Sequence, residues 1–219
     1  MARYGIRPAR AFGVSMGTMA PLAKRLGKDH ALALALWDTG WNEARMLAAL
    51  VDDPGRVTRR QMNAWVHDFD NWAVCDTACF HLFDRTPFAW EKVHSWSASE
   101  REYVRRAAFA LIASLAAHDR EAGDGSFEAF LPLIERAAED KRNFVRKAVS
   151  WALRQVGKHN SSLHARALTL AERLSRSEDS SERWVGRDAC RELRSPAVKR
   201  RLAARAARGT GTRGQGRRR

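Results

Sequence analysis

Apolar residues recur at intervals of three and four along almost the whole chain, and this spacing constrains the fold more than any other feature. The spacing matches the turn of an α-helix, whereas the two-residue alternation of a half-buried strand is absent. Alanine and leucine dominate the apolar positions over valine and isoleucine. We therefore expect an all-α fold.

Helix-breaking residues divide this pattern at fairly even distances. They are Gly27-Lys28-Asp29, Asp53-Pro54-Gly55, Thr86-Pro87, Gly123-Asp124-Gly125, residues 157–161 and Ser195-Pro196. They predict about twelve helices of roughly ten to fifteen residues, joined by short loops. Several helix pairs share an Ala/Leu-rich inner face without a strict sequence period, which is typical of degenerate helical repeats. We expect a HEAT-like or armadillo-type solenoid with a concave basic surface, a shape that suits duplex DNA.

Positive charge is concentrated in the last third of the chain. The 219 residues carry a net charge of +14, and residues 141–219 hold 22 Lys and Arg against 6 Asp and Glu. Such an uneven distribution of positive charge is typical of a surface or tail that binds a polyanion. We expect a single helical repeat domain over residues 1–205 and a disordered basic tail over residues 206–219, which are rich in glycine and arginine and have little to bury.

The composition also bounds the cellular setting. With 45% hydrophobic residues the chain is long enough to bury a sizeable core. The three cysteines are an odd number without a secretory signal, which argues for reduced thiols. No stretch approaches the roughly 20 apolar residues of a membrane span. We expect a monomer in a cytoplasm of the bacterial type, in the cytosol or nucleoid, with no membrane contact.

Three segments combine aromatic residues with charge. They are Trp72 followed four residues later by Asp76, then Tyr103-Val104-Arg105-Arg106-Ala107-Ala108, then Phe144-Val145-Arg146-Lys147-Ala148 running into Trp151-Ala152-Leu153-Arg154. In this order they resemble the DNA alkylation repair family of HEAT-like repeat glycosylases. The resemblance runs from about Tyr4 to Leu202, with too few residues before it for the N-terminal helices that the family usually carries. It implies a partner, double-stranded DNA with alkylated bases.

Asp76 is the candidate catalytic carboxylate. Because Trp72 and Asp76 are four residues apart, a helix places both on one face, and Cys79 and Phe83 continue that stripe. An acid among apolar neighbours is poorly solvated, which proteins tolerate mainly where the charge is used. From spacing alone, an aspartate bonded to the backbone of a neighbouring helix or to an arginine is the more ordinary interpretation. The family resemblance favours catalysis.

A carboxylate suits hydrolysis of an N-glycosidic bond. The reaction passes through an oxocarbenium-like sugar that is positive near C1′, and a fixed negative charge stabilises it. A purine alkylated at N3 or N7 is already cationic and leaves without a general acid to protonate it. One carboxylate that stabilises the sugar and orients a water is therefore sufficient.

A second set of candidates lies on the helix expected from Phe144. Its inward stripe is Val145, Val149, Ala152 and Val156, and its polar stripe is Lys147, Trp151, Arg154 and Lys158. We expect Trp151 to cover a deoxyribose or a cationic base while the cations hold phosphates. Packing against the adjacent repeat is the alternative for Trp151. Matching the Tyr103 segment to the family favours Arg106, ahead of Arg105, as a phosphate contact near the lesion.

Other residues give weaker signals. Trp37 and Trp41 lie between two expected helices and are second-choice candidates for the surface, whereas the remaining tryptophans are expected in the core. Cys75, Cys79 and His81 lack a second ligand pair at zinc-finger spacing, so we expect no metal. No P-loop or Gly-rich dinucleotide fingerprint is present, so we expect no cofactor.

Three functions fit these features. The first is a glycosylase in which Trp72 and Trp151 flank the deoxyribose whose C1′ faces Asp76. The second is a noncatalytic helical-repeat protein that binds nucleic acid or a partner protein through the same basic surface. The third is a protein-interaction scaffold. The cationic C-terminal third argues against the scaffold, and the presence of all three site residues favours the enzyme.

Overall fold

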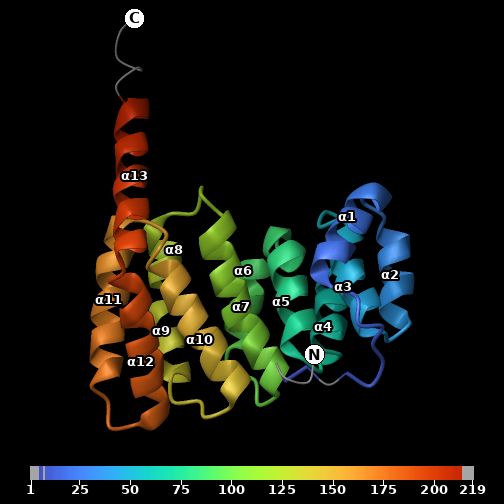
Figure 1. Cartoon of the computed structure of the whole chain (residues 1–219), viewed down its shortest axis with the longest axis horizontal. Coiled ribbons are helices and arrows are strands. Elements are labelled where there is room, and N and C mark those ends of the chain that lie inside the picture. Colours follow the sequence, from blue (N-terminus) through green and yellow to red (C-terminus); the bar gives the residue numbers. More distant parts are fainter. Residues whose placement is uncertain (1–4, 7, 214–219) are drawn as a thin grey trace, which may run out of the picture. The chain divides into compact units, whose positions relative to one another are not determined.

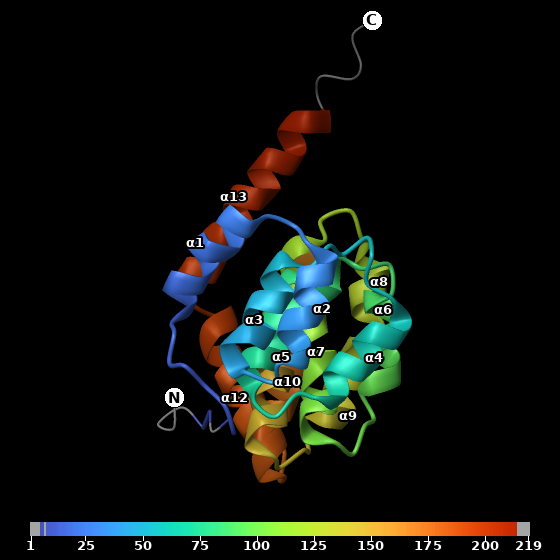
Figure 2. The same ribbon diagram turned by 90° about the vertical axis from the view of Figure 1, so that its right-hand side faces the viewer.

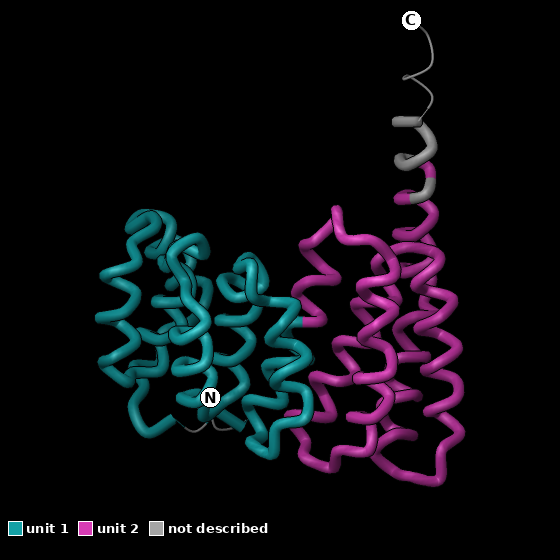
Figure 3. The backbone as a smooth tube through the Cα atoms, turned by 180° about the vertical axis from the view of Figure 1, so that it is seen from behind, with its two compact units in different colours: residues 1–111 teal, residues 112–219 magenta. Residues whose placement is uncertain are grey.

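The computed structural model describes residues 5, 6 and 8–213, and the regular elements among them are all helical (Figure 1). The all-α prediction is confirmed for these residues. The chain divides into two compact units, residues 1–111 and residues 112–219 (Figure 3). Each is described by itself.

The first unit contains the helices that carry the candidate carboxylate. They are α1 (Met16–Leu26), α2 (His30–Asp38), α3 (Asn42–Val51), α4 (Arg59–His67), α5 (Trp72–His81), the 3-10 turn η2 (Phe83–Arg85), α6 (Ala89–Trp96) and the first part of α7 (Glu102–His118). Helix α3 packs against α1, α2 and α5 (Figure 2). Polar side chains set the helix starts: Leu32 N donates to Asp29 Oδ1 over 2.9 Å, and Gln61 N donates to Thr58 Oγ1 over 3.1 Å.

Aromatic and alanine-rich segments form the core of this unit. The indoles of Trp37 and Trp65 stack with centroids 3.8 Å apart and planes 3° from parallel. In α7 the apolar run from Ala107 to Leu111 is fully buried on every side of the helix, as expected of a helix without a polar face. The core thus fixes α7 firmly enough to position the arginines at its start.

The second unit contains the rest of α7 and the remaining helices. They are α8 (Asp124–Glu128), α9 (Leu131–Ala137), α10 (Asn143–Val156), α11 (Ser161–Ser175), α12 (Ser180–Leu193) and α13 (Pro196–Arg213). Helix α10 packs against α9, α11 and α12. Helices α11 and α12 approach most closely at Gly186, where an added Cβ would lie 2.2 Å from Ser175 N and 2.6 Å from Ala171 O. Only glycine fits that position.

The predicted breaks mostly coincide with helix ends. Helix α1 ends before Gly27, whose φ of 73° favours glycine, and Pro196 opens α13. The expected break at residues 123–125 differs, because α8 begins there at Asp124. Helix α13 continues to Arg213, within the residues predicted as a tail, and residues 214–219 lie outside the described residues, so the disordered tail stays a prediction. No helix among the described residues has the length and apolar character needed to cross a membrane.

Candidate active site and nucleic-acid interface

Helix α5 holds Trp72 and Asp76 one turn apart. Its start is fixed by Asn71, whose buried side chain accepts from Ala73 N (2.9 Å) and Val74 N (3.2 Å) and donates to Asn42 Oδ1 (2.9 Å). Trp72 and Asp76 are both half-buried. The stripe predicted from the sequence therefore begins at the surface, and its continuation at Cys79 and Phe83 lies in the core.

Asp76 forms a two-point ion pair with Arg106 of α7. Arg106 Nε donates to Asp76 Oδ1 over 2.9 Å, and Arg106 Nη2 donates to Asp76 Oδ2 over 2.7 Å. The arginine side chain is 7% exposed and the carboxylate side chain 22% exposed. This fork geometry is among the stronger charge-assisted contacts in proteins. The sequence predicted separate roles for the two residues, with Asp76 as the catalytic carboxylate and Arg106 as a phosphate contact. In the structure the Arg106 guanidinium binds the Asp76 carboxylate.

Burial and charge oppose each other at this pair. Burial raises the pKa of the Asp76 carboxyl above its ordinary value, and the charge and hydrogen bonds of Arg106 act to lower it. Burial acts to lower the pKa of Arg106, but Asp76 outweighs it and the pKa is raised. The guanidinium is therefore a permanent cation, and the carboxyl is the member of the pair that takes up a proton in acid.

Arg105 and two cysteines lie close to the pair along α5 and α7. Arg105 is half-buried at the start of α7. The thiols of Cys75 and Cys79 donate to Tyr103 O (3.8 Å) and Ala107 O (3.6 Å) and so tie α5 to α7. Among the described residues no three His, Cys, Asp or Glu side chains gather as a metal site would require.

The two second-choice tryptophans have different surroundings. Trp37 is 2% exposed and donates through Nε1 to Asp68 Oδ2 over 2.8 Å. Trp37 is therefore not a candidate for the surface, because it stacks on Trp65 in the core. Trp41 is half-buried and stacks on Phe12 with centroids 4.1 Å apart.

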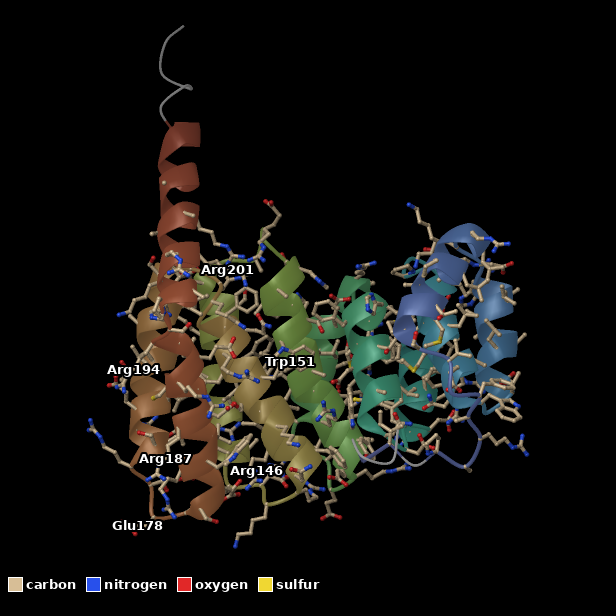
Figure 4. All side chains as sticks on the ribbon, in the orientation of Figure 1. Arg146, Trp151, Glu178, Arg187, Arg194 and Arg201 are labelled. Atoms are coloured by element: carbon tan, nitrogen blue, oxygen red, sulfur yellow. The ribbon has the colours of Figure 1, made fainter. Side chains whose placement is uncertain are left out.

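In the second unit, α10 has the predicted inward stripe. Its four members are fully buried: Val145, Val149, Ala152 and Val156. On the polar stripe Lys147 is exposed and Trp151 is half-buried. Figure 4 labels Trp151 on this helix.

Two of the predicted DNA-binding cations are bound by carboxylates of α12. Arg154 pairs with Glu192 through Nη1 and lies 3.6 Å from Asp188 through Nε, and Lys158 Nζ donates to Glu192 Oε1 over 2.5 Å. Burial acts to raise the pKa of Glu192, but the hydrogen bonds from Lys158 and Arg154 lower it below its usual value. Their positive charge is thus largely compensated within the unit.

Sequence reasoning missed the partners of these cations. Asp188 and Glu192 are four residues apart on α12, as Arg154 and Lys158 are on and just after α10. Complementary stripes with the same spacing on two helices are a detectable signal, but only once the helices are known to be neighbours.

Comparison with known proteins identifies relatives of the fold. A sequence model of the family described as "DNA alkylation repair enzyme" matches residues 1–193. No curated protein matches. A solved structure described as "a new family of proteins related to the HEAT-like repeat DNA glycosylases with affinity for branched DNA structures" has a TM-score of 0.71 and 19% identity, over 87% of this chain and 86% of that one. This similarity confirms the HEAT-like fold.

Two further solved structures are more distant. An engineered protein gives a TM-score of 0.40 at 14% identity, covering 81% of this chain and 91% of that one. A designed armadillo repeat protein in complex with the peptide (KR)4 gives 0.35 at 15% identity, covering 93% and 76%.

Proposed function

The chain belongs to the DNA alkylation repair enzyme family, and from this premise we propose that it is a DNA glycosylase that removes cationic N3- or N7-alkylated purines from duplex DNA. The observation that carries the proposal is the Asp76 carboxylate. It is partly exposed, lies one turn from Trp72, and is held in a fixed orientation by Arg106.

The proposed reaction assigns one role to each residue. Asp76 stabilises the positive charge that develops near C1′ as the bond to the purine breaks. The bonding electrons leave with the purine and neutralise its charge, while a water adds to C1′ and loses its proton to the carboxylate or to solvent. Arg106 positions the carboxylate and keeps it ionised. Trp72 covers the sugar, and Trp151 contacts the DNA from the second unit.

The raised pKa of Asp76 gives this mechanism a pH signature. The reaction needs the ionised carboxylate, so the rate falls in acid as Asp76 takes up a proton. Because burial raises the pKa of this carboxyl, the loss begins at a higher pH than for a solvent-exposed aspartate.

The test is release of 7-methylguanine from methylated duplex DNA by the purified protein. We expect Asp76→Asn to abolish release and to leave DNA affinity largely intact, because the amide keeps an acceptor for Arg106 and loses the charge. Asp38→Asn, an exposed acid at the end of α2, is the matched control and should release base at the parental rate. Unchanged release by a folded Asp76→Asn protein refutes the assignment.

A second candidate is noncatalytic binding of DNA. Two observations favour it: the ion pair gives Asp76 a structural partner, and the solved relative with a TM-score of 0.71 is described by its affinity for branched DNA. A pure binder gives salt-dependent affinity for DNA and no free base. The base-release assay separates the two candidates directly.

A further inference from the structure

The outward face of α12 carries a row of arginines. Arg183, Arg187, Arg191 and Arg194 are separated by four, four and three residues, so they share one side of the helix. We call these four residues the α12 arginine surface. The opposite side of α12, which includes Val185, Ala189 and Leu193, is fully buried. Figure 4 labels Arg187 and Arg194 on this helix.

Two cavities open along this surface. The first has a volume of about 330 Å³ and is lined by Ser180, Arg183, Trp184, Arg187, Asp188 and Arg191. The second has a volume of about 300 Å³ and is lined by Ser175, Arg187, Cys190, Arg191 and Arg194. Arg187 and Arg191 line both cavities, so the two cavities are adjacent, and these two arginines lie between them.

Two of the four arginines, Arg183 and Arg187, have no carboxylate partner among the described residues. Arg183 Nη1 donates to the backbone carbonyls of Ser177 and Glu178 (2.6 and 3.0 Å), which leaves its charge in place. Arg187 is exposed and, within residues 8–213, has no ion pair. Arg191 pairs with Asp188, whose carboxylate also accepts a hydrogen bond from the Ser150 hydroxyl (2.7 Å).

The fourth arginine is paired, and it marks the end of the row. Arg194 Nη2 lies 2.6 Å from Glu172 Oε1 of α11. Asp188 is the one acid among the residues that line the two cavities, against four arginines. The two cavities therefore favour anions, whereas Arg154 and Lys158 share the carboxylate of Glu192.

Trp184 adds a flat apolar wall to the first cavity. The guanidinium of Arg146 lies over its ring, 4.6 Å from the centroid. Cations beside an aromatic ring suit a chain that alternates phosphates with sugars and bases. A free inorganic anion would use only the arginines.

We propose that the α12 arginine surface binds the phosphodiester backbone of a DNA strand, with Trp184 against a sugar or base. This inference rests on the proposed function and supplies its DNA contacts in the second unit. From Arg183 to Arg191 the helix rises about 12 Å, and phosphates of one strand are spaced about 3.4 Å along a duplex axis. The row can therefore follow roughly three to four nucleotides.

The test measures DNA affinity against salt concentration by fluorescence anisotropy with an unmodified duplex. Arg187→Ala should weaken binding several-fold and reduce the magnitude of the negative slope of log K (association) against log[salt] by about 1, and the double variant Arg187→Ala/Arg191→Ala should reduce it by roughly 2. Alanine is a strong helix former, so both variants should fold. The matched control is Arg173→Ala, which removes an equal charge from an exposed α11 residue paired with Glu135 and should keep the parental slope.

The result is independent of the glycosylase assay. A double variant with the parental slope and affinity overturns the proposal, whatever the protein does to methylated DNA. If the salt dependence of the double variant is shallower while the parental protein releases no base, the arginine surface stands and the glycosylase assignment fails.

Discussion

The ion pair between Asp76 and Arg106 predicts an unequal double-mutant cycle. With charge centres about 4 Å apart and an effective dielectric constant near 20, the attraction is about 4 kcal/mol. The carboxylate is 22% exposed, so we place the loss on breaking the pair at about 2 to 3 kcal/mol, near the lower end of the values for buried pairs. The double variant of the cycle, Asp76→Leu/Arg106→Met, removes both partners together.

The two single variants should lose different amounts of unfolding free energy, because each leaves a different charged group without its partner. Asp76→Leu leaves a buried guanidinium that cannot lose its proton, so we expect a loss of about 3 kcal/mol in the free energy of unfolding. Arg106→Met leaves a carboxyl whose pKa rises further, because the lowering effect of Arg106 is gone. Its loss should be about 2 kcal/mol at neutral pH and should shrink, relative to the parent, as the pH falls and the carboxyl binds a proton.

Urea unfolding followed by circular dichroism measures the cycle. The double variant should lose no more than about 2 kcal/mol in the free energy of unfolding, which gives a coupling energy of at least about 3 kcal/mol. The control cycle uses the exposed pair Arg173 and Glu135, with side chains 64% and 37% exposed, where coupling should be below about 1 kcal/mol. If the two Asp76 and Arg106 effects add within about 0.5 kcal/mol, the pair does not act as a unit and the reasoning fails.

Two further variants test other parts of the structure. Gly186→Ala places a Cβ 2.2 Å from the backbone of α11, so overpacking should outweigh the gain in helix propensity and lower the free energy of unfolding by roughly 2 kcal/mol, measured by thermal unfolding. Its control is Gly17→Ala, at an exposed position without a contact closer than 3.6 Å, which should be neutral or stabilising. Glu192→Gln removes the carboxylate from Arg154 and Lys158 and should raise DNA affinity and steepen its salt dependence; an unchanged slope would mean that neither cation reaches DNA.

Local patterns predicted much of the helical structure. The apolar period identified the helices, Gly27 and Pro196 marked helix boundaries, and the inward stripe of α10 is buried as expected. These features depend on residues within one or two turns of each other, which a sequence displays directly. The local pattern failed at Gly123 to Gly125, where the two glycines predicted a break but the structure has the start of a short helix.

Contacts between helices were beyond local patterns. Asp76 and Arg106 are 30 residues apart, and Arg154 and Glu192 are 38 apart. Residue spacing fixes the face on which a side chain lies but not the helix that covers it. The α12 arginines carry no motif of the family resemblance, and they stand out only when Glu192 of the same helix is seen to pair with Arg154 and Lys158 instead.

An ion pair at Asp76 is compatible with catalysis if its geometry leaves the carboxylate accessible. Two ionised oxygens offer about four acceptor positions, and Arg106 occupies one on each. The pair has no net charge, so its field favours a cation only on the side of the carboxylate. A sugar cation that approached over the guanidinium would be repelled. Efficient base release therefore requires C1′ to approach from the exposed side of Asp76, next to Trp72, and a folded Asp76→Leu/Arg106→Met protein should bind methylated DNA without releasing base.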